Sequence, residues 1–378
     1  MIQKKPWALR LLALSGLLAG VAFCSAKAVA GTCELNPATN PLGSQPIIAT
    51  MPLLGANLTV GRDLPVGSEI YRQTFMPTTT TNLHCLNLTA QPLERDYFTA
   101  TPLPLSAWMG SPYGGKTYET GVAGVGVVIW FRSDVLPYTW SMPNCDTMMA
   151  NCGINSAPGN MALVVSLIKT GNVAAGVING ANFPSVVRDI VTDNILPVLR
   201  LNFSGTINIV SRTCTTPDVP VPLGSYRVSE LGGVGNGTPW KEFDIQLLNC
   251  PAFHGYFSTT GPQWSNDGST LPGTRTNNAV NFRLDPVNGV IDAANGVMSL
   301  TNSAPGEAPA ATGVGIQIAR RTAVPVPLGT MVAGFQASLT SLEGASFAIP
   351  LQARYLQTQG TVTPGPANGA AVFTLDYQ

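Results

Sequence analysis

Short runs of alternating apolar and polar residues recur along most of the chain after residue 30. They are rich in β-branched side chains and are mostly bounded by glycine, proline or asparagine, the pattern of β-strands joined by turns. Only 186–199 has a spacing that allows a helical turn or two. The sequence therefore predicts an all-β fold. The clearest predicted strands are 124–132, 161–169, 199–210, 243–248, 314–319 and 347–356.

The end of the chain alternates most sharply. One face of a predicted last strand carries Ala371, Phe373, Leu375 and Tyr377. Each of these side chains contributes on the order of 1.5–3 kcal/mol when buried. An open apolar strand edge also favours aggregation. We therefore expect this strand to need a partner strand that covers it.

The first 30 residues have the pattern of a secretory signal peptide. Lys4, Lys5 and Arg10 precede an apolar run over 11–23, and Ala-Val-Ala at 28–30 has the small-x-small form that signal peptidase cuts. The apolar run is too short for a stable membrane helix. Cys24 would suggest a lipoprotein, but a bulky residue precedes it where a small one is needed. We expect an exported, soluble mature chain that begins at Gly31.

Seven cysteines are present, and six remain when Cys24 is set aside. An even number in an exported chain favours disulfides, although six cysteines allow fifteen connectivities. A zinc site is the alternative, but no Cys-x-x-Cys pair occurs and the only histidines are His84 and His254. We expect no metal and no other cofactor. The simplest pairing is sequential: Cys33 with Cys85, Cys145 with Cys152, and Cys214 with Cys250.

The composition fits many short strands. Only 11% of the residues are charged, the formal net charge is zero, and there are 39 glycines and 31 prolines. Without a basic excess, nucleic acid is not an expected partner. The length exceeds one β-sandwich and favours two domains. Val-Pro-Val-Pro-Leu-Gly occurs at 219–224 and at 324–329, and its alternate prolines confine both segments to sheet edges or bends.

The part of the chain from Cys214 onward resembles the pilus subunits that the chaperone-usher pathway assembles. The resemblance rests on the penultimate Tyr377, on Gly365 fourteen positions from the end, and on the alternation between them. It also rests on Cys214 and Cys250, and on the segments 243–247, 313–318 and 349–355. The resemblance implies an immunoglobulin-like sandwich that lacks its last strand, with Cys214 bonded to Cys250.

In that family the missing strand is supplied by another chain. The resemblance implies a periplasmic pilus chaperone, an outer-membrane usher and an adjacent subunit that donates a β-strand as partners. A whole domain stands here where an ordinary pilin has a short donor segment, as in two-domain tip adhesins. We therefore expect a signal peptide over 1–30, a lectin-like receptor-binding domain over 31–210, a linker over 211–213 and a pilin domain over 214–378.

The first domain is similar to the mannose-binding adhesins of type 1 pili in the segments 31–33, 96–99, 111–115 and 163–170. The resemblance implies ligand-binding roles for the amine of Gly31, the carboxylate of Asp96, and the polar groups of Lys169 and Asn172. A carboxylate and an ammonium bind sugar hydroxyls through charge-assisted hydrogen bonds. The tyrosines that gate the family's pocket are replaced here by Leu88 or Asn87 and by Val173, which argues against mannose.

Structural interpretations remain open for these residues. Asp96 could satisfy backbone amides in a turn, and Lys169 and Asn172 could form a solvated hairpin end. Aromatic residues could stack on a sugar, although Trp130 and Trp140 lie in or beside apolar strands, which is typical of a core. The other aromatic candidates are Trp108, Tyr113 and Tyr138.

Three function classes are compatible with the pattern. The first is a fimbrial tip adhesin that is exported through the periplasm and attaches bacteria to host glycans or glycoproteins. The second is a structural or initiator subunit without receptor binding. The third is a hydrolase, but the positions of His84 and His254 support no serine triad, and nothing distinguishes Glu94, Asp96 and Glu119 as a catalytic carboxylate pair. We expect an adhesin with no catalytic residues.

Overall fold

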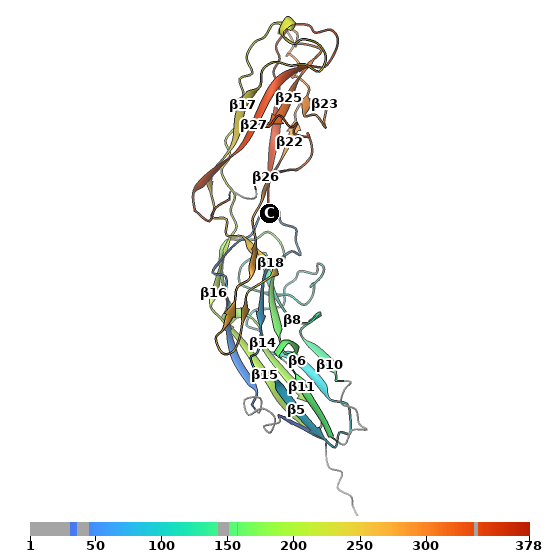
Figure 1. Cartoon of the computed structure of the whole chain (residues 1–378), viewed down its shortest axis with the longest axis vertical. Helices are drawn as coiled ribbons and strands as arrows, with labels where there is room; N and C mark the ends of the chain where they lie inside the picture. Colours follow the sequence, from blue (N-terminus) through green and yellow to red (C-terminus); the bar gives the residue numbers. More distant parts are fainter. Residues whose placement is uncertain (1–30, 36–44, 143–150, 157, 336–338) are drawn as a thin grey trace, which may run out of the picture.

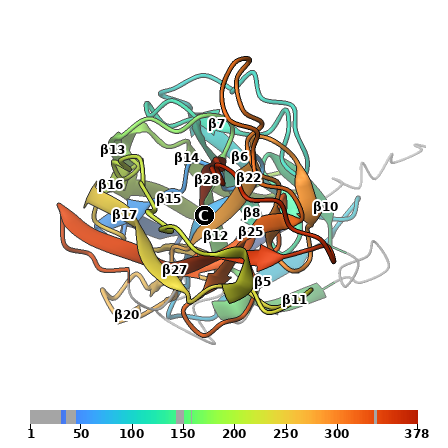
Figure 2. The ribbon, with the colours of Figure 1, turned by 90° about the horizontal axis from the view of Figure 1, so that it is seen from above.

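The computed structural model describes residues 31–35, 45–142, 151–156, 158–335 and 339–378. The molecule is elongated, with two β-rich parts stacked along its long axis (Figure 1). Seen along that axis, the strands of one part lie over those of the other, and the C-terminal residue lies near the centre (Figure 2). Among the described residues, no helix is long and apolar enough to cross a membrane. The all-β prediction is confirmed.

Two large sheets face each other in the first domain. One contains, in order, β20 (Thr270–Leu271), β19 (Gln263–Trp264), β4 (Glu69–Phe75), β12 (Leu163–Lys169), β8 (Val125–Phe131) and β7 (Tyr118–Glu119), with β9 (Asp134–Val135) beside β8. The other contains β10 (Tyr138–Ser141), β6 (Leu93–Ala100), β14 (Ser185–Val191), β15 (Ile195–Ser204) and β2 (Ile47–Pro52). These two sheets enclose the main core.

Smaller sheets close the two ends of the first domain. One contains β1 (Thr32–Leu35), β5 (Thr81–Leu86) and β11 (Asn151–Ser156), and lies at the end away from the second domain (Figure 1). The other contains β13 (Gly176–Asn179), β16 (Thr206–Val210) and β3 (Asn57–Thr59). The described residues also contain three short 3-10 turns: η2 (Pro158–Asn160) and η3 (Gly180–Asn182) in the first domain, and η4 (Val228–Glu230) in the second.

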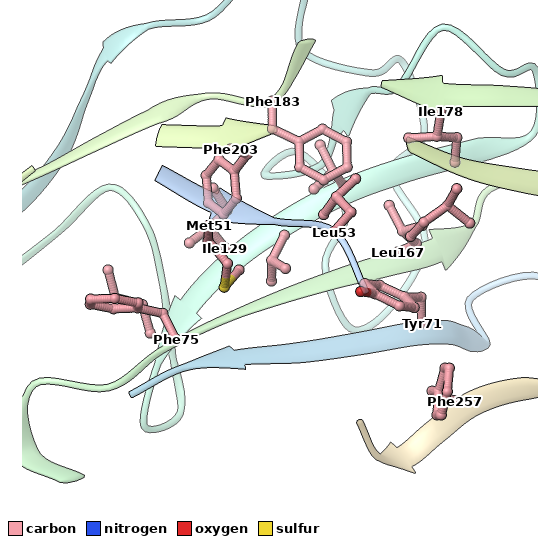
Figure 3. Packing of buried hydrophobic residues seen from close by; sticks show 14 of the residues in the cluster. Met51, Leu53, Tyr71, Phe75, Ile129, Leu167, Ile178, Phe183, Phe203 and Phe257 are labelled. Atoms are coloured by element: carbon pink, nitrogen blue, oxygen red, sulfur yellow. The ribbon is translucent and has the colours of Figure 1, made fainter. Parts of the chain in front are cut away.

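Alternation along each strand fills the core. In β2, for example, Ile47, Ala49 and Met51 are buried while the residues between them are exposed. Phe183 and Phe203 pack edge to face above Met51, and Ile129 and Leu167 come from the opposite sheet (Figure 3). The expected helical turn within 186–199 is wrong. That segment forms the hairpin of β14 and β15, because it is buried on both faces of a central strand, where β-branched residues pack well.

The second domain is a sandwich of two sheets. One contains β17 (Lys241–Cys250), β27 (Ala345–Gln357), β25 (Val314–Arg320), β24 (Val297–Met298) and β23 (Val290–Asp292). The other contains β26 (Val332–Phe335), β22 (Val280–Pro286) and β28 (Ala371–Tyr377). Neither Val-Pro-Val-Pro-Leu-Gly segment forms a named strand, as their prolines predict.

Two of the three expected disulfides are confirmed. Cys33 is bonded to Cys85 across the β1–β5 pair, and Cys214 is bonded to Cys250 at the end of β17. Cys145 lies within 143–150, outside the described residues, so its pairing with Cys152 stays a prediction.

A segment of the second domain is built into the first. The hairpin of β18 (Tyr256–Thr260) and β21 (Thr274–Thr276) starts at the joint and runs alongside the first domain (Figure 1). Between these strands, β19 adds to the free edge of β4, where the Thr74 and Met76 amides donate to the carbonyls of Pro262 and Trp264 (3.0 and 2.9 Å).

The same segment contributes side chains to the first domain's core. Phe257 packs edge to face against Tyr71, with ring centroids 6.0 Å apart (Figure 3), and Trp264 lies 5.9 Å from Phe75. Tyr256 and Phe257 belong to the same buried cluster as the first domain's strands. We still propose that the chain passes from the first domain to the second at 211–213. Residues 254–276, although they come after this point in the sequence, pack against the first domain.

Candidate functional site

The open edge of β28 is the main candidate site. In its sheet β28 pairs with β22 on one side, from Ala371 opposite Pro286 to Tyr377 opposite Val280. On its other side no described strand pairs with it. In an antiparallel pair, alternate residues point their amide and carbonyl groups to opposite sides. Gln378 exchanges both backbone hydrogen bonds with Ala279, on the β22 side. Ala371 and Phe373 are an odd number of residues away from Gln378, so their amide and carbonyl groups point to the opposite, open edge.

A groove runs between this edge and the start of the second domain. On one side lies the segment 218–223, which makes no named strand, and on the other lies the beginning of β28. The hollow between them measures about 340 Å³. Its floor is the core itself. The apolar floor residues are Ile245, Leu284, Met298, Ile316 and Ile318.

The groove continues past the start of β28. A second hollow of about 440 Å³ lies between 224–228 and 362–368, the segments that follow and precede the walls of the first hollow. Tyr355 lines it from β27. The two hollows are lined by consecutive segments of the chain, 218–223 then 224–228 on one side and 362–368 then 369–373 on the other. Two hollows in a row beside a strand edge suit an extended chain more than a compact ligand.

The predicted alternation in β28 is confirmed. Leu375 and Tyr377 are buried in the second core, and Ala371 and Phe373 pack against it while half-buried. The half-buried pair is the one beside the groove, so burial increases toward the C-terminus. Tyr377 also accepts a hydrogen bond from the Cys214 amide (3.3 Å) through its hydroxyl. The apolar face of β28 is therefore fully buried at its C-terminal end and only partly buried at its start.

The 61–63 loop of the first domain covers the C-terminal end of β28. The Asp63 amide donates to the Tyr377 carbonyl (3.0 Å), the Tyr377 amide donates to Asp63 Oδ2 (2.9 Å), and Arg62 Nη2 donates to the Leu375 carbonyl (3.1 Å). Gly61 is required here, because an added Cβ would lie 2.3 Å from the Tyr377 carbonyl oxygen. The open edge is thus limited to the first half of the strand.

Lys169 holds that loop in place. Its ammonium donates to the carbonyls of Gly61 (3.0 Å) and Arg62 (2.6 Å), and the residue is buried. Burial lowers the pKa of Lys169, while the charge of Asp63 opposes the shift. The sugar-ligand role of Lys169 stays a prediction; in this fold two of its three ammonium donors bond backbone carbonyls at the joint between the domains.

Asp96 is also committed within the fold. It is fully buried on β6, where both of its oxygens accept hydrogen bonds from Arg188 at 2.7 Å. Burial lowers the pKa of Arg188, but the hydrogen bonds and charge of Asp96 outweigh it and raise the pKa overall. The role of Asp96 as a ligand carboxylate stays a prediction; in this fold the side chain is fully buried against Arg188, so a sugar hydroxyl could reach it only if this pair opened.

The four predicted ligand residues do not converge. Gly31 lies at the far end of the first domain, where its amide donates to Asp193 Oδ2 (2.6 Å). Asn172 lines a hollow at the joint together with Arg212. One residue therefore lies at the distal end, one in the core and two at the joint, so a single pocket built from all four is not formed. Among the described residues, no cluster of acidic, histidine or cysteine side chains could hold a metal ion.

Sequence reasoning missed the 61–63 loop and the 254–276 segment. At Gly61 and at Gly261 another segment of backbone lies so close that a Cβ atom would clash with it. In the sequence each of these glycines only precedes a short polar stretch. Glycine beside such a stretch signals only a turn. The partners across the joint are far away in sequence, so their contacts could not be predicted from the local pattern.

The chain is similar in sequence to fimbrial proteins. The family model for fimbrial protein matches residues 201–378. The type-1 fimbrial protein A chain of Escherichia coli is 33% identical over 182 residues, which are 47% of this chain and 82% of that protein. A fimbria adhesin protein of Klebsiella pneumoniae is 25% identical over 337 residues, which are 72% of this chain and 95% of that protein.

The CupB6 tip adhesin from Pseudomonas aeruginosa aligns over 92% of this chain and 94% of its own, with 14% identity and a TM-score of 0.34. From the sequence relationship to fimbrial subunits, which covers the strands around the groove, the chain belongs to the fimbrial protein family.

Proposed function

We propose that the chain is a strand-accepting subunit of a chaperone-usher fimbria, placed at the fibre tip, and that its first domain binds a receptor on host cells. The observation that carries this proposal is the open edge of β28 beside an apolar groove. An added strand would bond to the free backbone groups of Ala371 and Phe373 and pack apolar side chains against the apolar floor of the groove.

The tip position is supported by what precedes the second domain. The described residues between 45 and 210 are folded into the first domain's sheets, so this part of the chain offers no free donor segment to a neighbour. Similarity to the Klebsiella pneumoniae fimbria adhesin protein runs through most of the chain and not only through the pilin-like part. A subunit that accepts a strand without giving one caps a fibre.

The partners follow from the groove. A periplasmic chaperone would occupy it first and the adjacent subunit would replace the chaperone, with passage through an outer-membrane usher between these steps. The receptor would be a host glycan or glycoprotein held without covalent chemistry. Many fibres on one cell would add avidity to a weak single site.

Immunogold labelling of fimbriated bacteria with an antibody against the first domain tests the proposal. We expect gold particles at fibre ends and loss of attachment to host cells when the chain is deleted. Labelling along the shaft would contradict the tip position. Labelled ends together with unchanged attachment would identify an initiator subunit that binds no receptor.

A further inference from the structure

A further hollow lies on one flank of the first domain, where β8 turns into β9. It measures about 490 Å³, within the roughly 300–1,000 Å³ range of small-ligand sites. The loop 112–116 forms one wall, and Trp130 of β8 with the turn into β9 forms the other. Two aromatic residues, Tyr113 and Trp130, line it, and neither belongs to the apolar core.

Trp130 is held rigidly on the outer face of the sheet. Its indole Nε1 donates to Ser166 Oγ (2.9 Å), and Ser166 in turn donates to Glu69. The Arg72 guanidinium lies 4.9 Å from the centre of the Trp130 ring and donates twice to Glu69 (3.0 and 2.6 Å). The network crosses three adjacent strands, β4, β12 and β8. A ring fixed in this way loses little side-chain entropy when a ligand packs on it.

The rim of the hollow carries polar groups that the fold does not use. Lys116 is exposed and forms no ion pair with any described residue, and the hydroxyls of Tyr113 and Ser133 make no hydrogen bond within the described chain. Asp134, unlike these three residues, already has a partner: its half-buried carboxylate accepts a hydrogen bond from the Tyr138 hydroxyl. Aromatic walls with an ammonium, a carboxylate and hydroxyls around them are typical of small-ligand binding sites.

We propose that this hollow binds one sugar ring of a glycan. The apolar C–H face of a pyranose would pack on Tyr113 and Trp130, and its hydroxyls would bond to Lys116 and Asp134 through charge-assisted hydrogen bonds. A peptide ligand would instead need a long strand edge or an extended groove, and this hollow is compact. The assignment rests on the proposed adhesin function and places its site on the flank of the domain.

The test uses the full chain in complex with its chaperone, on a printed array of neutral, sialylated and uronate-containing glycans. Lys116→Ala changes an exposed position and Tyr113→Ala a half-buried one outside the apolar core, so both variants should stay folded, which thermal unfolding checks. We expect each to weaken binding to the recognised glycan at least tenfold, and Lys241→Ala, an exposed lysine of the second domain, to have no effect. The bound glycan should also protect Lys116 from acetylation, read by mass spectrometry.

The outcomes separate this inference from the adhesin function. Unchanged glycan binding by both variants, with Lys116 still reactive, would overturn the flank site while leaving the adhesin function intact. Attachment to a matrix protein with no glycan bound would do the same. Absence of any binding to cells, glycans or matrix proteins would overturn both.

Discussion

Asp63 and Tyr377 hydrogen-bond reciprocally across the joint between the domains. Each residue's amide donates to the other residue, to the Tyr377 carbonyl in one direction (3.0 Å) and to the Asp63 carboxylate in the other (2.9 Å). The pair ties the C-terminal end of β28 to the 61–63 loop of the first domain. Only the first half of the β28 edge is therefore open.

Replacing Asp63 should loosen this joint. Asp63→Ala leaves the Tyr377 amide without its acceptor, and we expect the free energy of unfolding to fall by about 1–3 kcal/mol. Urea unfolding measures the loss, and hydrogen exchange at the Tyr377 amide localises it. Asp292→Ala, in a surface turn of the second domain, is the matched control. Unaltered exchange at Tyr377 in Asp63→Ala would show that the pair does not hold the joint.

The 254–276 segment should be needed for the first domain's stability. A Cβ at Gly261 would lie 1.7 Å from the Arg72 carbonyl oxygen, so Gly261→Ala should detach β19 from β4. We expect a lower melting temperature and rapid proteolysis within 254–276. Gly360→Ala, where a Cβ meets nothing within 4 Å, should behave as the unmodified chain.

This segment also bears on experiments with fragments. We expect residues 31–210 alone to aggregate, since they lack Phe257 and the strand that covers the β4 edge. Ligand screens should use the whole chain. A stable, monomeric 31–210 fragment would contradict the structural role of the segment.

Asp96 should matter for stability and not for receptor contact. Asp96→Asn removes the partner that bonds Arg188 through two oxygens and leaves only Glu94, 3.3 Å from Arg188 Nε, so we expect a loss of up to about 3–5 kcal/mol, the range for breaking a buried pair. Asp96→Asn combined with Arg188→Met should recover only part of this loss, because it leaves the Glu94 carboxylate buried without a cation. Receptor binding per folded molecule should stay unchanged in both variants. A selective loss of binding in a fully stable Asp96→Asn protein would restore the ligand role.

Acid should weaken the joint through His254. Burial and the nearby Arg275 lower the pKa of His254 below its ordinary 6.5. The unfolded chain then takes up a proton first as the pH falls, so stability decreases from about pH 7 downward until the folded pKa is passed. We expect His254→Gln to lose less stability than the unmodified chain between pH 7 and 5 in urea unfolding. Equal losses in the two proteins would contradict the assignment.

The strands and the assembly edge could be predicted, but the ligand site could not. The pattern in β28 predicts its buried face because alternation with a period of two is a local property. The run at 199–210 reads as one strand but is broken at Gly205, whose positive φ sends β15 and β16 into different sheets. Asp96 looks like a loop carboxylate until Arg188, far away in sequence, is placed beside it. Long-range partners decide such roles.

Hydrogen exchange along β28 tests the central claim most directly. The full chain, without chaperone, would be compared with and without a peptide that copies the N-terminal extension of the neighbouring fimbrial subunit; a scrambled peptide without alternation serves as the control. We predict fast exchange at the Ala371 and Phe373 amides in the free chain, strong protection with the peptide, and a higher melting temperature. Amides that are already protected in a stable, monomeric free chain, with no response to the peptide, would contradict the account.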